Sequence, residues 1–434
     1  MADMATAARS PILWQNHDQT VTLLDIPRSI EAAQGTEKYP CSDHLLSCEA
    51  LQVAFPSDQP KSDAAKAKLT NNTVDQKLHA EYDTTLKQAL EDIERHYGGP
   101  WCYERPCVAR GTKRKRTSSE AGVDCGQTKA DHGTDLPQIV LEKVVQGSGC
   151  VAVKTVKSGD DPTLSDCTCD NDVGQDNFLT NCAEQPATCQ VRHQDQNYIF
   201  RLPPRSSALL GDCSQPREFH RAVRAQASAH ETPRHFDFIL MDPPWPNRSV
   251  RRTHKTAGAT YQTSPTMNTM YDLIAGMDLD MLMSDDCLVS IWTTNKQAVR
   301  DLILGEGGLF EQWGVELEEE WLWLKVTAKG EPVMPFDNVW RKPYEVLLIG
   351  RRHRPSNDVP EPTQVGLKRR VLVGVPDLHS RKPCLKQLLE SLLPDSPRVL
   401  EIFARHLMAG WWSWGNECIK FNWDGYWRKA HHHG

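Results

Sequence analysis

The chain has 434 residues, of which 39% are hydrophobic, and its formal net charge at pH 7 is −7. This length allows two or three domains, and the apolar content is sufficient for a core without a disulfide framework. We expect no membrane span, because no run of about 18 apolar residues occurs, and no secretory signal at the N-terminus. The 14 cysteines are therefore expected to be reduced thiols. The net negative charge argues against non-specific wrapping of nucleic acid by the whole molecule.

The first 194 residues are polar and interrupted. Residues 1–108 form an N-terminal region of unknown role. Residues 84–97 have helical apolar spacing there, and residues 1–80 show no sustained periodicity. Residues 109–194 are predicted to be a flexible linker, with a short strand within 139–156 and an acidic stretch at 157–190. The linker contains Lys113-Arg114-Lys115-Arg116, which resembles a nuclear localisation signal and predicts a nuclear protein, with the cytosol as the alternative.

Residues 195–434 alternate between strand and helix patterns. This alternation predicts one doubly wound α/β domain, preceded by a partly disordered N-terminal region. Eleven of the 13 tryptophans lie after residue 240, and those near the C-terminus are expected in its core. The predicted strands are 236–241, 287–292, 320–326, 344–350, 370–374, 398–404 and 417–422, and the predicted helices are 271–283, 297–313 and 384–393.

The most informative motif is Asp242-Pro243-Pro244-Trp245, which follows the apolar run 236–241. The run predicts a buried parallel strand, and open α/β sheets bind ligands at the carboxyl ends of such strands. Asp242 and the carbonyl of Pro243 can accept the two N–H groups of an exocyclic amine, and Pro244 stiffens the loop. Trp245 offers a face on which a base can stack, a contact of roughly 1–3 kcal/mol. The tetrapeptide therefore predicts an adenine-like substrate, whereas in isolation it is also compatible with a tight turn.

A second group of polar residues follows the predicted strand 398–404. Arg405 can pair with a carboxylate, and Asn416 and Glu417 can accept or donate hydrogen bonds at a ribose or adenine. Lys382 lies just before the helix that leads into the same strand. This pattern predicts a cofactor edge that follows the substrate motif in chain order.

Taken together, these motifs resemble the adenine-N6 methyltransferases with an Asp-Pro-Pro-Trp motif, the family of the messenger-RNA N6-adenosine methyltransferase. The resemblance covers about residues 195–428 and is strongest to the branch of methyltransferase-like protein 4. It implies a class I S-adenosylmethionine-dependent fold, Rossmann-like with a permuted motif order. The matching segments are Leu202–Ser207, Asp242–Asn247 with Ser249-Val250, Lys342–Glu345, Lys382-Pro383, Leu400–Arg405, Gly410-Trp411 and Trp414–Glu417.

The resemblance also implies roles for individual residues. It assigns Asp242, Pro243, Pro244 and Trp245 to the target base. The implied S-adenosyl-L-methionine site consists of Asp212, Cys213, Lys382, Arg405, His406, Asn416 and Glu417. The implied or candidate substrate residues are Asn247, Arg248, Arg251, Arg252, Lys255 and Tyr261, and the basic ones are expected to clamp phosphates. Leu407 and Met408 depart from the family, which has polar cofactor contacts at this point.

These observations predict direct methyl transfer to N6 of adenosine in RNA. The resemblance implies an internal 2′-O-methylated adenosine of a small nuclear RNA. DNA adenine methylation and a non-catalytic RNA-binding subunit remain open as alternatives, and no motif identifies a protein partner. We expect no metal, because the candidate ligands have irregular spacing without Cys-x-x-Cys pairs; these are Cys167, Cys169, Cys182, Cys189 and His193.

Overall fold

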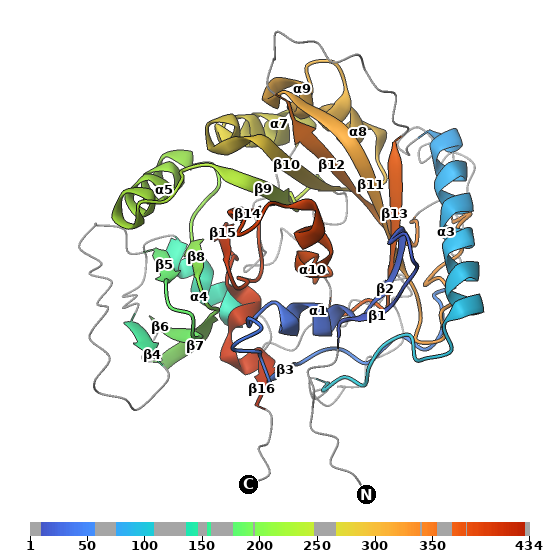
Figure 1. Ribbon diagram of the computed structural model, residues 1–434, viewed down its shortest axis with the longest axis horizontal. Coiled ribbons are helices and arrows are strands. Elements are labelled where there is room, and N and C mark those ends of the chain that lie inside the picture. Colours follow the sequence, from blue (N-terminus) through green and yellow to red (C-terminus); the bar gives the residue numbers. More distant parts are fainter. Residues whose placement is uncertain are drawn as a thin grey trace, which may run out of the picture.

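The computed structural model of the chain is shown in Figure 1. It describes residues 10–56, 75–107, 136–145, 154–157, 177–193, 196–246, 266–338, 341–353, 367–378 and 380–429.

An 11-stranded sheet forms the centre of the molecule. Most neighbouring strands run parallel, and β1, β12 and β5 are antiparallel to their neighbours. From edge to edge the strands are β1 (Ile12–Gln15), β2 (Val21–Leu24), β13 (Lys368–Gly374), β11 (Val315–Lys325), β12 (Tyr344–Arg352), β10 (Met283–Thr293), β9 (Phe236–Met241), β14 (Val399–Ile402), β15 (Trp411–Trp414), β8 (Ser206–Leu209) and β5 (Phe178–Asn181).

Each face of the sheet has its own hydrophobic core. Figure 1 shows the sheet curving around α1 and α10, with the longer helices on its outer side. Because side chains of a strand alternate between the two faces, Ile239 and Met241 of β9 enter the outer core, whereas Phe238 and Leu240 enter the inner one. The outer helices are α3 (Gln76–His96), α5 (Pro216–His230), α7 (Met267–Ala275), α8 (Gln297–Leu304) and α9 (Leu309–Trp313), with the 3-10 turn η1 (Leu279–Leu282). The inner ones are α1 (Ile26–Ala32), α10 (Lys386–Leu389) and η2 (Glu390–Leu392).

A smaller unit packs beside the β8 end of the main sheet. Its core joins α4 (Leu136–Val145) to a three-stranded sheet of β4 (Lys154–Lys157), β6 (Ala187–His193) and β7 (Gln196–Leu202). The same core takes up Leu407 and Ile419 from the C-terminal segment. That segment continues through η3 (Lys420–Asn422) and η4 (Asp424–Tyr426) to β16 (Trp427–Arg428), which pairs with β3 (His44–Leu45).

The topology places a ligand crevice at the end of β9. β9 lies between β10, which follows it in the chain, and β14, which is added from the C-terminal part. The chain therefore leaves the sheet in different directions at β9 and β14. Such a switch point opens a crevice at the carboxyl ends of the strands, and Asp242 lies there.

Most of the predicted elements are confirmed, including the parallel strand 236–241 and the doubly wound α/β class. The N-terminal region, however, contributes to the same sheet, because β2 pairs with β13. The strand predicted within 139–156 is wrong over residues 139–145, which belong to helix α4. Within the predicted flexible stretch 157–190, residues 178–181 and 187–190 form strands, and residues 158–176 lie outside the description.

The strand predicted at 417–422 is also wrong. The last central strand is β15, which precedes that segment, and residues 420–422 form a 3-10 turn. β15 is the tryptophan-rich segment Trp411–Trp414, and it is fully buried between β14 and β8. Among the described residues, no helix is long and apolar enough to cross a membrane.

Candidate active site

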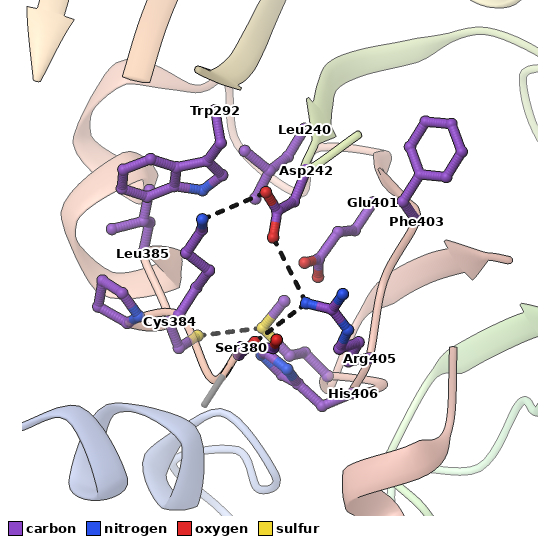
Figure 2. Close-up of a pocket in the computed structure, with 13 residues that line it drawn as sticks. Leu240, Asp242, Trp292, Ser380, Cys384, Leu385, Glu401, Phe403, Arg405 and His406 are labelled. Carbon is purple, nitrogen blue, oxygen red and sulfur yellow. Dashed lines mark hydrogen bonds and ion pairs between the residues drawn. The ribbon is translucent and has the colours of Figure 1, made fainter. Parts of the chain in front are cut away.

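Asp242 is the first residue after β9 and lies between two cations (Figure 2). Its backbone N–H donates to the carbonyl of Ile402 at 3.4 Å, so the loop is tied to β14. One carboxylate oxygen lies 3.2 Å from Nζ of Lys382, and the other lies 3.7 Å from Nη1 of Arg405. The structure therefore brings together three of the predicted site residues from three distant segments.

The two prolines and the tryptophan form a tight turn. The N–H of Trp245 donates to the carbonyl of Pro243 at 2.8 Å, as in a γ-turn centred on Pro244. A carbonyl oxygen has two lone pairs, so that of Pro243 can accept one more hydrogen bond. The indole Nε1–H of Trp245 donates to the carbonyl of Trp292 at 2.7 Å, and the residue is 6% exposed. Trp245 thus anchors the loop in the outer core, and its stacking on a base stays a prediction.

Lys382 bridges two carboxylates. Besides Asp242 it contacts Glu345 at 2.6 Å, and Glu345 also forms an ion pair with Lys325. Burial acts to lower the pKa of Lys382, but Asp242 and Glu345 outweigh it and raise that pKa. Burial acts in the opposite sense on Glu345, where Lys325 and Lys382 prevail and hold its pKa well below the usual range. Both groups are therefore charged at neutral pH.

Arg405 continues this pattern on the other side of Asp242. Its Nε donates to Glu417 at 3.1 Å and its Nη1 to the carbonyl of Ser380 at 3.1 Å. Glu417 in turn lies 3.3 Å from Lys420. Charges of alternating sign thus run along the carboxyl edge of the sheet, in the order Lys325, Glu345, Lys382, Asp242, Arg405, Glu417 and Lys420.

A pocket opens beside Asp242 on the inner face of the sheet (Figure 2). Two of its lining residues, Ser380 and Phe403, have φ values of 69° and 58°, in the left-handed region that non-glycine residues rarely adopt. Such backbone strain is concentrated at functional sites. The lining residues are Leu240, Asp242, Trp292, Ser380, Lys382, Pro383, Cys384, Leu385, Glu401, Phe403, Arg405, His406 and Met408.

His406, a predicted cofactor residue, lines this pocket and is 6% exposed. Burial, followed by the charges of Arg381 and Arg405, lowers its pKa to about 4, so the ring is neutral at pH 7. Its Nε2 has no hydrogen-bond partner among the described residues. Leu407, where the family pattern is broken, is buried in the core of the smaller unit and offers no side chain to the pocket.

The residues predicted at the adenosine end lie in two neighbouring loops. Backbone hydrogen bonds join Gly211 to Gly415 and Gly415 to Leu209 at 3.3–3.4 Å. Asn416 follows in the second loop, and its buried Oδ1 has no partner among the described residues. Asp212 follows Gly211 and caps its own turn, accepting from Ser214 at 2.9 Å.

Two of the residues predicted at this end have buried side chains. The thiol of Cys213 is buried in the outer core and 4% exposed, so only the backbone of this residue is available to a ligand. Glu417 is 1% exposed and is held by Arg405 and Lys420. Its side chain therefore positions Arg405, and a direct contact with the cofactor would require that pair to open.

The predicted substrate residues are not part of the described site. Asn247, Arg248, Arg251, Arg252, Lys255 and Tyr261 lie outside the described residues, as do the basic cluster 113–116 and the cysteines Cys167 and Cys169. Across the ranges that are described, no group of three or more His, Cys, Asp or Glu side chains could hold a metal ion.

Of the 13 residues that line the pocket, only Asp242, Lys382, Arg405 and His406 were predicted as site residues from the sequence. The other nine include the polar or aromatic residues Trp292, Ser380 and Glu401. Glu345, which pairs with Lys382, appeared only within a matching segment. In the sequence, Glu401 stands out as a carboxylate within a predicted apolar strand, because Leu400 and Ile402 flank it.

The polar groups in and beside the pocket suit the amino-acid end and the nucleoside of S-adenosylmethionine. Lys382 and Arg405 offer cations to a carboxylate. Two atoms of the lining, Glu401 Oε2 and His406 Nε2, and Asn416 Oδ1 in the neighbouring loop are buried and lack hydrogen-bond partners among the described residues. Buried polar atoms are normally satisfied, so these point to a polar ligand. When bound, the cofactor supplies an activated methyl group. The sheet, its switch point and this pocket define a class I S-adenosylmethionine-dependent methyltransferase.

Comparisons with known proteins identify the family. The family model described as MT-A70 matches residues 236–417. The N6-methyladenosine RNA methyltransferase MTA1 of Cryphonectria parasitica is 31% identical over 428 residues, which are 97% of this chain and 94% of that protein. The chain therefore belongs to the MT-A70 family and is an adenine-N6 methyltransferase.

Two further relatives match about half of the chain. The N(6)-adenine-specific methyltransferase METTL4 of Mus musculus is 36% identical over 240 residues, which are 52% of this chain and 44% of that protein. The DNA N6-methyl methyltransferase of Caenorhabditis elegans is 30% identical over 220 residues, which are 50% of this chain and 53% of that protein. The names of these relatives thus include both an RNA and a DNA methyltransferase.

Proposed function

We propose that this enzyme methylates N6 of adenosine in RNA. The observation that supports RNA over DNA is the share of this chain that each relative matches. The relative named as an RNA methyltransferase matches 97% of the chain, including the N-terminal elements, whereas the relative named as a DNA methyltransferase matches 50%. Within RNA, the proposed target is an internal 2′-O-methylated adenosine of a small nuclear RNA, as the motif resemblance implies. Nuclear localisation belongs to the same proposal.

The proposed chemistry uses Asp242 and Pro243 as acceptors for the target amine. The lone pair of that amine is conjugated into the purine, so the amine is a weak nucleophile. Hydrogen bonds to Asp242 and to the free lone pair of the Pro243 carbonyl favour a more tetrahedral nitrogen. Orientation in such a near-attack geometry can supply about 7–11 kcal/mol of the barrier. The turn closed by the Trp245 N–H, at 2.8 Å from the Pro243 oxygen, holds both acceptors in place.

Methyl transfer to matched oligonucleotides tests the substrate proposal. One position would carry adenosine, 2′-O-methyladenosine or deoxyadenosine in an otherwise identical strand. A pocket that accommodates one extra methyl group discriminates by roughly 10–200-fold, so we expect kcat/KM for the 2′-O-methylated RNA to exceed that for adenosine by at least about 10-fold. Equal rates on the two RNAs would contradict the 2′-O-methyl proposal. A preference for deoxyadenosine would establish DNA as the substrate instead.

A row of arginines on α5 supports contact with nucleic acid. Arg217, Arg221 and Arg224 are exposed and lie at i, i+4 and i+7, so they share one face over about 10 Å of helix. None has an ion-pair partner among the described residues. The helix begins four residues after Asp212, at the cofactor edge of the sheet. Such a row suits the phosphates of a bound strand.

Replacing all three arginines by glutamine is expected to weaken RNA binding. Each phosphate contact on a single strand contributes about 0.7 to the slope of log K against log salt, so the slope should fall by about 2. Fluorescence anisotropy across a salt series measures both affinity and slope. The matched control changes the exposed Lys77, Lys87 and Arg95 of α3 (Figure 1) to glutamine. An equal effect of the two triple variants would contradict a specific role for α5.

A further inference from the structure

A second pocket lies on the inner face of the main sheet, near the edge that the N-terminal strands form. It has a volume of about 120 Å³ and lies between the strands β1, β2, β11 and β13 on one side and α10 with η2 on the other. Its walls are apolar, with Trp321 and Leu372 on the sheet and Leu388 on α10. Among the described residues, none lines both this pocket and the one beside Asp242. The second pocket is therefore separate from the site described above.

An irregularity in the edge strand turns a polar side chain into the second pocket. Between Ile12 and Trp14 the pairing of β1 with β2 shifts by one residue, which is a β-bulge. The bulge breaks the alternation of side chains between the faces, so Ile12 packs against the inner core and Trp14 against the outer one. Gln15 therefore points to the inner face, where its Nε2 donates to Thr22 at 2.9 Å and both residues line the pocket. This arrangement leaves the amide oxygen of Gln15 for a ligand.

Two more glutamines line the second pocket where it opens to solvent. Gln19, in the turn between β1 and β2, has a φ of 57°, in the left-handed region where glycine is the usual residue. Its carbonyl accepts from Nη1 of Arg370 at 3.3 Å, which ties the turn to β13. Gln387 of α10 is exposed on the opposite side of the opening. Amide groups from the sheet and from the helix thus converge on one opening.

The charge in the lining of the second pocket is balanced. Arg370 is the only charged side chain among the described residues that line it, and it is 8% exposed. Its Nε and Nη2 donate to the two oxygens of Glu319 at 2.7 and 3.2 Å, which is a bidentate ion pair. Lys368, which lies 3.2 Å from the same carboxylate, is outside the lining. Amides and hydroxyls donate as well as accept, so the pocket suits an uncharged ligand that has both donors and acceptors.

We propose that the second pocket binds a nucleobase, with adenine preferred. A base is flat and uncharged at neutral pH, so it fits between the apolar walls of the sheet and α10, and its edge carries donors and acceptors together. A glutamine amide pairs with adenine through one donor and one acceptor. The size is suitable, because an enclosed cavity of about 150 Å³ holds benzene and this pocket of about 120 Å³ also opens to solvent.

The base can belong to a free nucleoside or to a bound strand. β13 is four strands from β9 in the order of the sheet. At about 4.8 Å per strand, the second pocket therefore lies roughly 20 Å from Asp242 along the sheet. The binding chemistry is the same for both sources, and the two ligands used below distinguish them.

Calorimetry on the enzyme saturated with S-adenosylhomocysteine tests the proposal, because the cofactor site is then filled. The ligands are adenosine and a single-stranded oligoadenylate, and ribose, which lacks the base, should not bind. The Ser391→Trp variant places an indole in the pocket from an exposed position and should abolish binding of adenosine. The Gln387→Leu variant should weaken it by about 2–10-fold, the loss of one neutral hydrogen bond. Gln88→Leu, an exposed glutamine of α3 outside the pocket, is the matched control and should bind as wild type.

The two ligands assign the source of the base. Loss of both adenosine and oligoadenylate affinity in Ser391→Trp would mean that the pocket takes free nucleosides and bases of a strand, whereas loss of one alone would assign it to that source. The proposal is overturned if Ser391→Trp leaves the binding of both ligands as in wild type, or if Gln387→Leu and Gln88→Leu have equal effects. Binding of S-adenosylhomocysteine shows that each variant is folded. If Ser391→Trp does not fold, Gln387→Leu and its control decide.

Discussion

The Asp242→Ala variant is expected to lose methyl transfer by about 10³-fold or more while it still binds the cofactor. A side chain that takes a proton from the reacting group contributes typically 10²–10⁴-fold to the rate, and Asp242, placed to accept from the amine that loses a proton on methylation, also orients that amine. Its removal takes one carboxylate partner from Lys382 and from Arg405, which lie 3.2 and 3.7 Å from it, while their pairs with Glu345 and Glu417 remain. The cofactor carboxylate meets the same two cations, so its affinity should be unchanged or higher.

Two measurements separate these effects. Single-turnover transfer from labelled S-adenosylmethionine to saturating RNA gives the rate, and calorimetry with S-adenosylhomocysteine gives the affinity. The control is Asp395→Ala, which alters an exposed aspartate in the loop before β14. If rate and affinity fell together, Asp242 would act mainly in cofactor binding or in folding of the site.

The local signals at the catalytic motif were sufficient to predict its position. The apolar run 236–241 and the turn residues after it are contiguous, and the physics that forms a buried parallel strand acts within that run. Its neighbours β10 and β14 confirm the parallel sheet. The position of the loops predicted to bind the cofactor followed for the same reason, because each follows a strand and all such ends meet at one edge of a parallel sheet.

The prediction failed where tertiary packing decided the structure. Residues 139–145 are rich in valine and isoleucine, which favour strands, yet they lie in α4. There Val140, Leu141 and Val144 fall on one helical face and enter the core of the smaller unit. In the same way, β2 has four residues and its partner β13 is about 350 residues distant. Nothing local identifies such a pairing.

The ion pairs of the site likewise could not be predicted from the spacing of residues in the sequence. Lys382 meets Glu345 and Asp242 only because the fold brings together the ends of β12 and β9 with the loop before α10. The sequence offered Glu345 as part of a matching segment and gave no pairing for it. Ion pairs between distant segments form only in the complete sheet, so the two acidic partners of Lys382 are evident only from the structure.

The N-terminal region is joined to the catalytic sheet by a buried carboxylate, Glu320 of β11. Its side chain is 0% exposed. One oxygen accepts from Tyr82 of α3 at 2.9 Å and from Arg300 at 2.7 Å, and the other accepts from Arg369 at 3.0 Å. Next to Tyr82 on α3, Glu81 also pairs with Arg369 at 3.0 Å. The helix therefore depends on an ion cluster inside the methyltransferase domain.

Replacing Glu320 by alanine is expected to lower the free energy of unfolding by about 1.5–3 kcal/mol, because the half-buried Arg300 and Arg369 and the buried Tyr82 hydroxyl would lose their shared acceptor. The same change at Glu318, two residues away and partly exposed against Arg351, should cost at most about 1 kcal/mol. Urea unfolding followed by circular dichroism compares the two, with an unchanged slope showing that stability alone was altered. Equal losses in both variants would mean that the cluster does not hold α3 to the sheet. A large loss at Glu320 alone would make the N-terminal region a structural part of the catalytic domain, consistent with its place in the central sheet.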